Sequence, residues 1–458
     1  MSTTPAENQL AAPTLKRALG LRDLILYGII VIQPTAPMPG FGVFANASKG
    51  QVVTCILVGM VAMVFTAISY GRMARAYPSA GSAYTYVGRE IHPALGFVTG
   101  WSMTMDYMIN PLICTIWCGK AMLDFLPDVP PRFWFVIFAS LFTVLNLRGV
   151  ETSARINKIL CGVMGAVIVA FFVVTWRYLF HHGPYDASFF YRPFHNPQEF
   201  RGNVILHGTS LAVLTYIGFD GISTLSEEVH NPRRNILLAT VIVCIVTGVL
   251  ASAEVYSAQL LHPAYGFSEM EAERAFAHVA AIAGGPAMAL AITLTLFVAT
   301  FGSGMGAQLG AARLLYGMGR SNAIPKGIFG AVDPRTRIPR NNVLIVGAVA
   351  LVGACFIRDY DRAAELLNYG ALIAFMGVNL ASLKRYFIRG RGRSFTNFVV
   401  PVLGFLICAA LWLNLSRPAL IGGSIWMFLG VAYGAWKTRG FRAELVTFDV
   451  PSESEREL

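Results

Sequence analysis

The chain alternates between long apolar runs and short polar or basic segments. A run of roughly 20 apolar residues is long enough to cross the hydrocarbon core of a bilayer as a helix. Twelve runs meet this condition, and we predict from them an all-α integral membrane protein with twelve transmembrane helices. Their approximate bounds are 24–45, 52–73, 94–126, 133–148, 154–180, 205–228, 235–261, 284–312, 341–357, 364–387, 396–414 and 418–436.

Two of these runs are interrupted near the middle. The first carries Gln33-Pro34-Thr35-Ala36-Pro37, followed by Met38 and Pro39, and the sixth carries Gly218-Phe219-Asp220-Gly221. Proline removes a backbone donor and glycine loosens a helix. Inside a bilayer such a break persists only where it lines a polar cavity. Paired broken helices of this kind indicate the binding site of an inverted-repeat secondary transporter.

The two interrupted runs divide the chain into corresponding halves. Residues 24–180 and 205–387 hold five runs each, and each half opens with its interrupted run. An odd number of spans per half inverts the second half relative to the first. We therefore expect a ten-helix transport core over 24–387. Two further helices over 388–436 lie outside that core, and we expect them to serve packing or oligomer contacts. Polar tails cover residues 1–23 and 437–458.

Composition agrees with this class. Hydrophobic residues make up 55% of the chain and charged residues 13%, and the mean hydropathy is +0.56. These values exclude an ordinary soluble domain. The seven cysteines all fall in apolar runs without metal-ligand spacing, which favours small buried side chains.

The net charge of +11 has an uneven distribution. If the N-terminus is cytoplasmic, far more Lys and Arg residues fall in cytoplasmic segments than in outer ones. This satisfies the positive-inside rule, places both termini in the cytoplasm and explains the basic balance by lipid headgroups without nucleic acid. We predict a multi-pass protein of the bacterial plasma (inner) membrane.

Two polar features need separate treatment. The segment 77–86 is too polar to cross, and we expect it at the cytoplasmic interface with its tyrosines at headgroup level. Lys120 lies too far along the third run to pair with Asp106, so we expect it to snorkel to the outer surface.

Several motifs resemble those of a known superfamily. The sequence from Ala80 to Tyr86 followed by Gly96 to Trp101, the sequence from Ile217 to Asp220 leading to Glu227-Glu228, and the sequence from Ala312 to Arg320 running to Lys326 occur in order along most of the chain. Together they resemble the amino acid–polyamine–organocation (APC) superfamily. Further sequences, including Asn368 to Leu372, are most similar to the bacterial putrescine importers.

This resemblance implies ten core helices in two inverted repeats, with substrate held between the first and sixth helices. It also implies uptake driven by a proton gradient, although exchange occurs within the superfamily. Two departures stand out: the first break is rich in proline where amino acid carriers often have a Gly-Ser-Gly type break, and Met164 occupies the place of a fifth-helix lysine found in some proton-coupled members.

The first break has a chemical preference of its own. An amino acid carboxylate is usually received by free backbone N–H groups at a half-helix N-terminus. Pro34, Pro37 and Pro39 have no N–H, whereas freed carbonyls suit an ammonium group. The break therefore either selects amines over carboxylates or is only a structural kink.

Two carboxylates lie near mid-depth of their spans. Asp106 is in the third run, next to Tyr107 and near Asn110, and Asp220 is in the sixth. An ionised carboxylate at this depth is expensive unless it faces a cavity or a partner. Asp220 either contacts the substrate amine, carries a proton or caps the amides of its own helix. Asp106 either contacts substrate or makes a structural hydrogen bond.

Tyr216 and Phe219 flank the second break, where they either close over a bound amine by cation–π contact or only pack. Glu227, Glu228 and Arg75 either form a cytoplasmic gate or are solvated helix-end charges. The predicted substrate-binding residues are Gln33, Pro34, Thr35, Ala36, Pro37, Asp106, Tyr107, Asn110, Tyr216, Gly218, Phe219, Asp220 and Thr224, and the predicted coupling or gate residues are Asp220, Glu227, Glu228 and Arg75.

Other functional classes lack their signatures. No phosphate-binding loop of the kind used by nucleotide-driven pumps is present, and the histidines do not form a catalytic or metal-binding cluster. We predict a polyamine importer of the putrescine type, working by alternating access, with no metal or cofactor. The alternatives are an amino acid permease and, more remotely, a membrane enzyme. Oligomeric state stays open.

Overall fold

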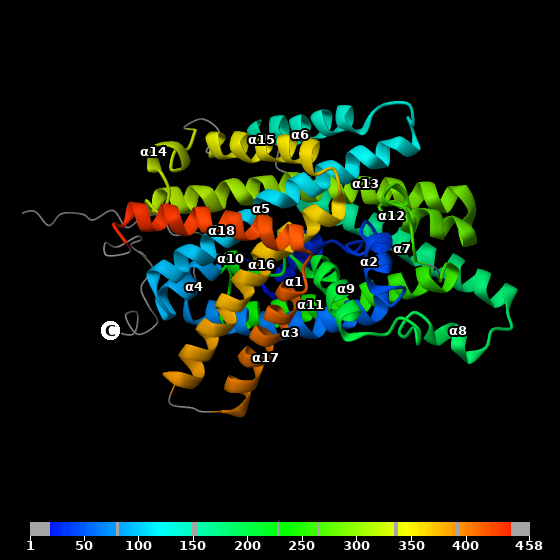
Figure 1. Ribbon diagram of the computed structural model, residues 1–458, viewed down its shortest axis with the longest axis horizontal. Coiled ribbons are helices and arrows are strands. Elements are labelled where there is room, and N and C mark those ends of the chain that lie inside the picture. The colour runs from blue at the N-terminus through cyan, green and yellow to red at the C-terminus, as the bar shows by residue number, and fades with distance from the viewer. Residues whose placement is uncertain are drawn as a thin grey trace, which may run out of the picture.

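A computed structural model describes residues 19–78, 82–148, 154–226, 229–263, 265–333, 338–390 and 394–440, without the side chains of 154–158, 224, 269 and 270. The regular structure in these ranges is helical, and long helices run side by side along one axis (Figure 1). We call the end with α4 (Ser82–Glu90) and α14 (Lys326–Phe329) the basic end. The opposite end, with α8 (Ala187–Tyr191) and α12 (Glu269–Ala272), is called the loop end.

Each of the twelve predicted spans coincides with a helix or a broken helix. Nine stretches of the described chain are long and apolar enough to cross a membrane by themselves. The other three predicted spans are the broken first one, the polar α5 and the short α6. The unbroken spans are α3 (Val52–Ala76), α5 (Pro93–Ala121), α6 (Pro131–Leu147), α7 (Ala154–His182), α11 (Pro232–Leu261), α13 (Ala275–Arg320), α15 (Arg340–Ile357), α16 (Tyr360–Leu383), α17 (Phe395–Leu413) and α18 (Arg417–Lys437).

Both interrupted spans are broken in the structure, as predicted. The first consists of α1 (Leu21–Ile32) and α2 (Phe41–Ser48), joined by a non-helical segment. The second consists of α9 (Gly202–Ala212), a 3₁₀ turn η2 (Val213–Tyr216) and the short α10 (Gly221–Thr224). Both lie in the middle of the bundle (Figure 1).

The packing follows the expected inverted symmetry. Helix α3 packs on α11, and α6 packs on α15, so the second and fourth spans meet their own counterparts. The contact of α1 with α11 has its counterpart in the contact of α9 with α3. The contact of α7 with α13 corresponds to that of α16 with α5. Contacts repeated in this way are expected of two halves related by a pseudo-twofold axis.

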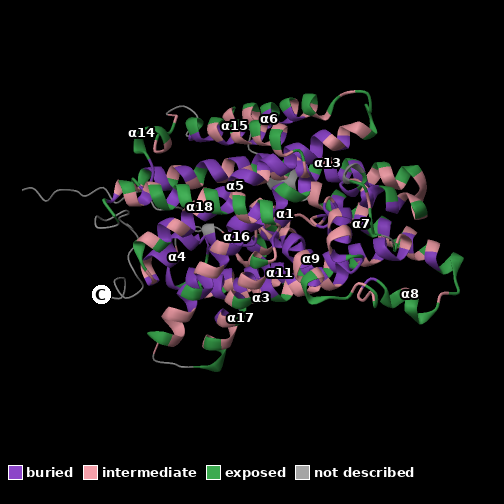
Figure 2. Ribbon diagram, viewed as in Figure 1, coloured by how far each residue is buried: buried purple, intermediate pink, exposed green. Residues whose placement is uncertain are grey.

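Exposed and buried positions are distributed as in a membrane protein. Large apolar side chains are exposed on the outer faces, including Val169 and Val173 on α7 and Ile421 and Phe428 on α18. Buried residues line the middle of the bundle and exposed ones its outer faces and ends (Figure 2). Because an apolar exterior of this kind is favourable only in lipid, the chain is a multi-pass membrane protein.

The segment after α3 differs from its prediction. Residues 82–90 form helix α4, which packs against α5 and α16, and its Tyr84 and Tyr86 are buried. The expectation that these tyrosines lie at headgroup level is therefore wrong. The small residues favour close packing: a Cβ on Gly100 of α5 would lie only 2.7 Å from the Tyr84 ring.

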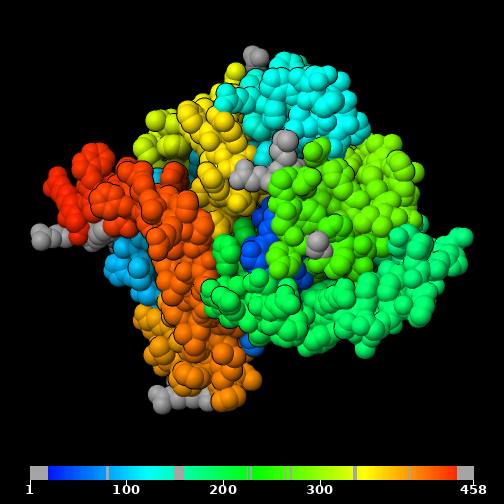
Figure 3. All heavy atoms as spheres, turned by 45° about the vertical axis from the view of Figure 1, so that its right-hand side comes forward, coloured from blue at the N-terminus to red at the C-terminus, as the bar shows by residue number. Residues whose placement is uncertain are grey.

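The eighth span is longer than predicted. Helix α13 includes a kink at Gly285, where φ is 65° and ψ is −169°, and Pro286 follows directly. The part before the kink packs toward the core, since Phe276 lies 5.5 Å from Phe41 of α2, ring centroid to centroid. In a view turned toward the loop end, the N-terminal region, coloured blue, lies recessed between segments coloured green (Figure 3).

Helices α17 and α18 pack against the core. Trp101 of α5 and Trp426 of α18 stack with ring centroids 4.7 Å apart, and each indole N–H donates to the other residue's carbonyl, at 2.8 and 3.1 Å. Helix α17 packs on α16 and α3. Both helices therefore pack on the core, and their role in packing or oligomer contacts stays a prediction.

Candidate functional site

The second break depends on one glycine. After η2, Ile217 is extended and Gly218 has φ of +120°, a conformation that glycine adopts readily and other residues rarely do. The chain then turns through Phe219 and Asp220 into α10. The break thus follows from Gly218, and it places Asp220 at the start of the short helix.

The two breaks lie against each other. A Cβ added to Gly218 would lie 3.1 Å from a methyl of Val31, in the last turn of α1. One added to Gly28 would collide with Ile222 of α10 and Val243 of α11. Small residues therefore allow the end of α1 to reach the second break, and residues distant in sequence form one region.

Backbone amides of the first break donate hydrogen bonds within the break itself. Ala36 and Met38 donate their N–H groups to the carbonyls of Gln33 and Thr35, at 3.2 and 3.0 Å. Gln33, with φ of 73°, donates its side-chain amide to the Ala299 carbonyl of α13. Thr35 is buried, and its hydroxyl has no hydrogen-bond partner among the described residues. With three prolines besides, the break presents acceptor oxygens more than N–H donors.

Asp220 is held by a neighbouring helix. Its side chain is 2% exposed and accepts a hydrogen bond from the Tyr107 hydroxyl of α5 at 3.3 Å. Asp220 is the N-cap residue of α10, but its side chain makes no cap hydrogen bond there. Its contact with Tyr107 reaches across the site, and the alternatives that we considered for Asp220 stay predictions.

Asp106 lies one residue from Tyr107 and close enough to Asp220 for their charges to interact. It is 4% exposed, and α16 packs tightly beside it, since a Cβ on Gly370 would lie 3.1 Å from the Asp106 nitrogen. Asn110 is half-buried and accepts a weak hydrogen bond from the Cys114 thiol within α5. The structure thus brings Asp106, Tyr107 and Asp220 together.

The two aromatic candidates differ in placement. Phe219 is fully buried and packs edge-on against Tyr70 at 5.5 Å and against Phe375 at 5.2 Å, ring centroid to centroid. Tyr216 is also fully buried, and its hydroxyl donates to the Ile56 carbonyl of α3 at 2.7 Å. Because Tyr216 is anchored to α3, its placement corresponds to the packing role and not to closure over an amine.

The predicted gate cannot be assembled from the described chain. Glu227 and Glu228 lie outside the described residues, and only the backbone of Thr224 is described, within α10. Arg75 is exposed in the last turn of α3. The gate therefore stays a prediction.

An ion network at the basic end escaped the sequence analysis. The Glu90 carboxylate of α4 lies 2.6 Å from the Arg385 guanidinium of η3 (Lys384–Ile388), and the Tyr77 hydroxyl donates to Glu90 at 2.7 Å. Arg385 also lies over the Tyr77 ring, 5.0 Å from its centroid. Glu90 is only 3% exposed. A lone acid between basic segments was the signal that could have revealed it.

Lys120 does not snorkel to the surface as expected. Its ammonium lies 2.6 Å from Glu273, which precedes α13, and the two side chains are 13% and 4% exposed. Burial raises the pKa of the Glu273 carboxyl to about 7 even with Lys120 alongside. A small cavity at this end is lined by Met38 of the first break together with Trp117, Glu273 and Leu296. The first break therefore borders a polar recess.

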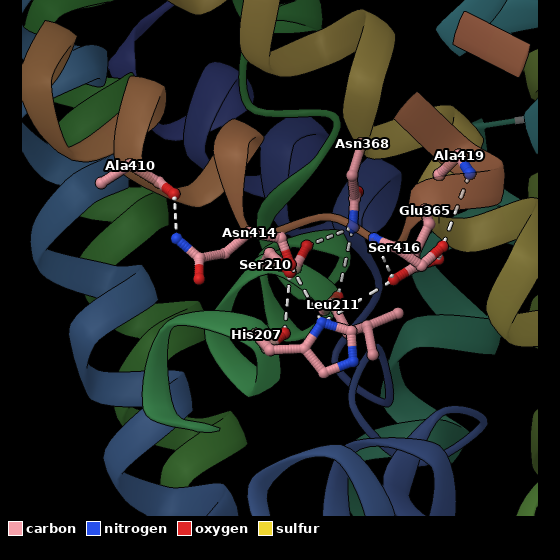
Figure 4. Close-up of polar contacts among 9 residues, drawn as sticks. All are labelled: His207, Ser210, Leu211, Glu365, Asn368, Ala410, Asn414, Ser416 and Ala419. Carbon is pink, nitrogen blue, oxygen red and sulfur yellow. Dashed lines mark hydrogen bonds and ion pairs between the residues drawn. The ribbon is translucent and has the colours of Figure 1, made fainter. Parts of the chain in front are cut away.

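A second polar network anchors the other broken helix (Figure 4). The Asn368 amide of α16 donates to the Ser210 carbonyl at 2.7 Å, where α9 begins to unwind. One turn away on α16, Glu365 accepts from the Ser416 backbone at 3.1 Å and lies 3.9 Å from His207 of α9. The network connects α9, α16 and the linker before α18, which spacing along the sequence could not reveal.

Comparison with known proteins agrees with this arrangement. The amino acid permease family matches residues 41–436. The low-affinity putrescine importer PlaP of Escherichia coli (strain K12) is 32% identical over 93% of this chain and 95% of its own length. The branched-chain amino acid permease BcaP of Lactococcus lactis is 29% identical, over 92% of this chain and 95% of its own. The methylthioribose transporter of Bacillus subtilis is 27% identical, over 92% and 93%. The chain therefore belongs to the amino acid permease family of membrane transporters.

Proposed function

We propose that this chain imports a polyamine of the putrescine type by alternating access, driven by a proton gradient. The observation that carries the proposal is the position of Asp220, a buried carboxylate between Tyr107 and its own broken helix, against a proline-rich first break. An ammonium group is a suitable partner for that carboxylate. The similarity to the putrescine importer PlaP supports the same substrate class.

The substrate site in this proposal has two sides. Asp220, Tyr107 and Asp106 supply negative charge and a hydroxyl, and the segment 33–37 supplies carbonyl oxygens. Phe219 contributes an apolar wall from the aromatic cluster with Tyr70 and Phe375. A diamine with two ammonium groups and an apolar chain matches such a mixture of acceptors and aromatic surface.

The chain takes up its substrate into the cytoplasm in this proposal, with the basic end inside and both termini on that side. The basic residues near η3 and α14 support the orientation. No catalytic role is proposed, since the site chemistry and the relatives are those of carriers.

An amino acid permease is the second candidate, favoured by the similarity to BcaP. The two differ in one chemical requirement, because an amino acid brings a carboxylate that needs donors. In the first break, the three prolines lack an N–H and the amides of Ala36 and Met38 are already engaged. This break therefore favours the amine.

The test is uptake into proteoliposomes with matched pairs that differ only by a carboxylate. Labelled putrescine is the substrate and ornithine the paired competitor, with cadaverine against lysine as a second pair. We expect saturable putrescine uptake that needs an inward proton gradient and is inhibited more strongly by each amine than by its carboxylated partner. Uptake of labelled ornithine or lysine, without putrescine uptake, would establish the permease instead.

A further inference from the structure

One carboxyl in the membrane core has no role in the site described above. Glu254 lies in α11, about two turns from its end at Leu261, and its side chain has no exposed surface. Neither of its carboxyl oxygens has a hydrogen-bond partner among the described residues. An unpaired ionised carboxylate buried in this way costs several kcal/mol, so this arrangement is compatible only with the neutral acid.

The position of Glu254 on α11 is informative. Val243, Thr247, Ala251, Glu254 and Ala258 recur at helical spacing and are all buried, so they form one face of the helix. Val243 lies directly against Gly28 of α1. Eleven residues make about three turns, which places Glu254 roughly 16 Å beyond that contact and past the end of α1. Helix α1 thus covers this face at Val243 and does not reach as far along it as Glu254.

The surroundings offer Glu254 no described counter-charge. Helices α1, α3, α7, α10 and α13 and the turn η2 pack against α11. Described charges on α1, α3, α7 and α13 lie within about two turns of a helix end: Arg22, Asp23, Arg72, Arg75, Arg177, His181, His182, His278, Arg313 and Arg320. Tyr27, Tyr70 and Tyr216 on these elements surround the second break with Asp220.

We infer that Glu254 carries the proton that couples transport to the gradient. The inference rests on the proposed function. With the loop end open to water, the carboxylate takes a proton from hydronium and becomes a neutral acid that closure can bury. When the site opens to the other side and water reaches Glu254, the O–H bond breaks and the proton passes to that water. One proton then moves inward with each substrate molecule, and no other reactant is needed.

Asp220 and Glu254 have different roles in this inference because their surroundings differ. Asp220 accepts a hydrogen bond from Tyr107, which suits the ionised form and an ammonium partner. Glu254 has no such donor among the described residues, so a proton is the partner that neutralises it when buried.

The experiment compares coupled and uncoupled transport in proteoliposomes. Wild type and Glu254→Gln are assayed for putrescine counterflow, which needs no gradient, and for accumulation under an imposed pH gradient with the membrane potential clamped. A trapped pH dye follows proton entry. The matched control is Ser252→Ala, which removes another buried, unpartnered polar group of α11 that cannot carry the proton.

We expect Glu254→Gln to keep counterflow and to lose both accumulation and substrate-dependent proton entry. One coupled proton supports about tenfold accumulation per pH unit, so the variant should fall from that ratio to equal concentrations. Ser252→Ala should keep the gradient response. Glu254→Asp, which retains a titrating group, should keep coupling with a shifted pH profile, and it provides the test if the glutamine variant does not fold.

Full accumulation by Glu254→Gln would overturn the inference, as would loss of counterflow and accumulation together in a folded variant. Equal loss of coupling in Ser252→Ala would overturn it as well. If wild type itself shows neither counterflow nor accumulation of putrescine, the proposed function has failed, and that outcome is distinct from a failure confined to Glu254.

Discussion

The two helix breaks meet in space but are built from opposite chemistry. The first uses proline, and the amides of Ala36 and Met38 are taken up in turns of the break itself. The second uses Gly218 with φ of +120° and leads directly into Asp220, whose buried carboxylate accepts from Tyr107. In the proposed function, the first break offers carbonyl oxygens and the second a negative charge, so both sides favour a cation although each reaches that result differently.

Removing the charge of the second break should have the largest effect. Asp220→Asn leaves the shape but removes the anionic partner, and we expect about a 100-fold rise in the apparent KM for putrescine, the cost of breaking a buried charged contact. Tyr107→Phe removes one donor, keeps the charge and should cost about tenfold. Uptake kinetics in proteoliposomes measure both. Uptake by Asp220→Asn close to wild type would show that the second break does not hold the cation.

The backbone of the second break can be tested apart from its charge. Gly218→Ala places a Cβ 3.1 Å from Val31 at a positive φ, so we expect a loss of roughly 1–3 kcal/mol in stability together with slower uptake. Gly221→Ala is the matched control, because its Cβ would meet nothing nearer than the Tyr27 hydroxyl at 3.9 Å. Thermal unfolding in detergent reports the difference. Equal stability of the two variants would contradict the conclusion that the positive φ at this position requires glycine.

The first break borders the recess that holds Glu273. Because of this carboxyl, we expect the stability of the protein to depend on pH. Burial raises the pKa of Glu273 from 4.5 to about 7, so the carboxyl binds protons more tightly in the folded state. Its stabilising contribution is complete below pH 4.5 and is lost as the pH rises through 7. We expect stability to fall with a slope of up to about 1 kcal/mol per pH unit in this window.

Denaturant unfolding between pH 4.5 and 8 measures this slope. Glu273→Gln should flatten it, whereas Glu271→Gln, at an exposed residue nearby, should leave it unchanged. A wild-type slope that survives in Glu273→Gln would assign the titration to another group.

Detaching the first break from α13 should have the smallest effect. Gln33→Leu removes the amide that donates to Ala299, and we expect a loss of about 1 kcal/mol, or a few-fold increase in the KM for putrescine. Maximal uptake should change little. If Gln33→Leu costs as much as Asp220→Asn, the first break contributes more to binding than its carbonyls alone explain.

The sequence by itself determined the class, the twelve spans and both breaks. Apolar run length decides which segments cross a bilayer, and proline or glycine decides where a helix breaks. Both effects depend on residues close together in the sequence, so the breaks at Pro34 and Gly218 could be predicted without the tertiary structure. The polar character of Asp106 and Asp220 inside apolar runs was equally visible. Their grouping with Tyr107 was only partly foreseeable, because neighbours in sequence indicate a shared helix and not a facing partner.

Tertiary structure alone decided which polar groups meet. We expected Lys120 at the surface, but in the structure it pairs with Glu273. We considered Tyr216 for the pocket, but its hydroxyl donates to the Ile56 carbonyl. Asn368 and Glu365 hold α9 across more than 150 residues of chain, and Glu254 is left without a described partner. Helix periodicity sets the face of a side chain, but the helix that covers this face depends on how all the spans pack together.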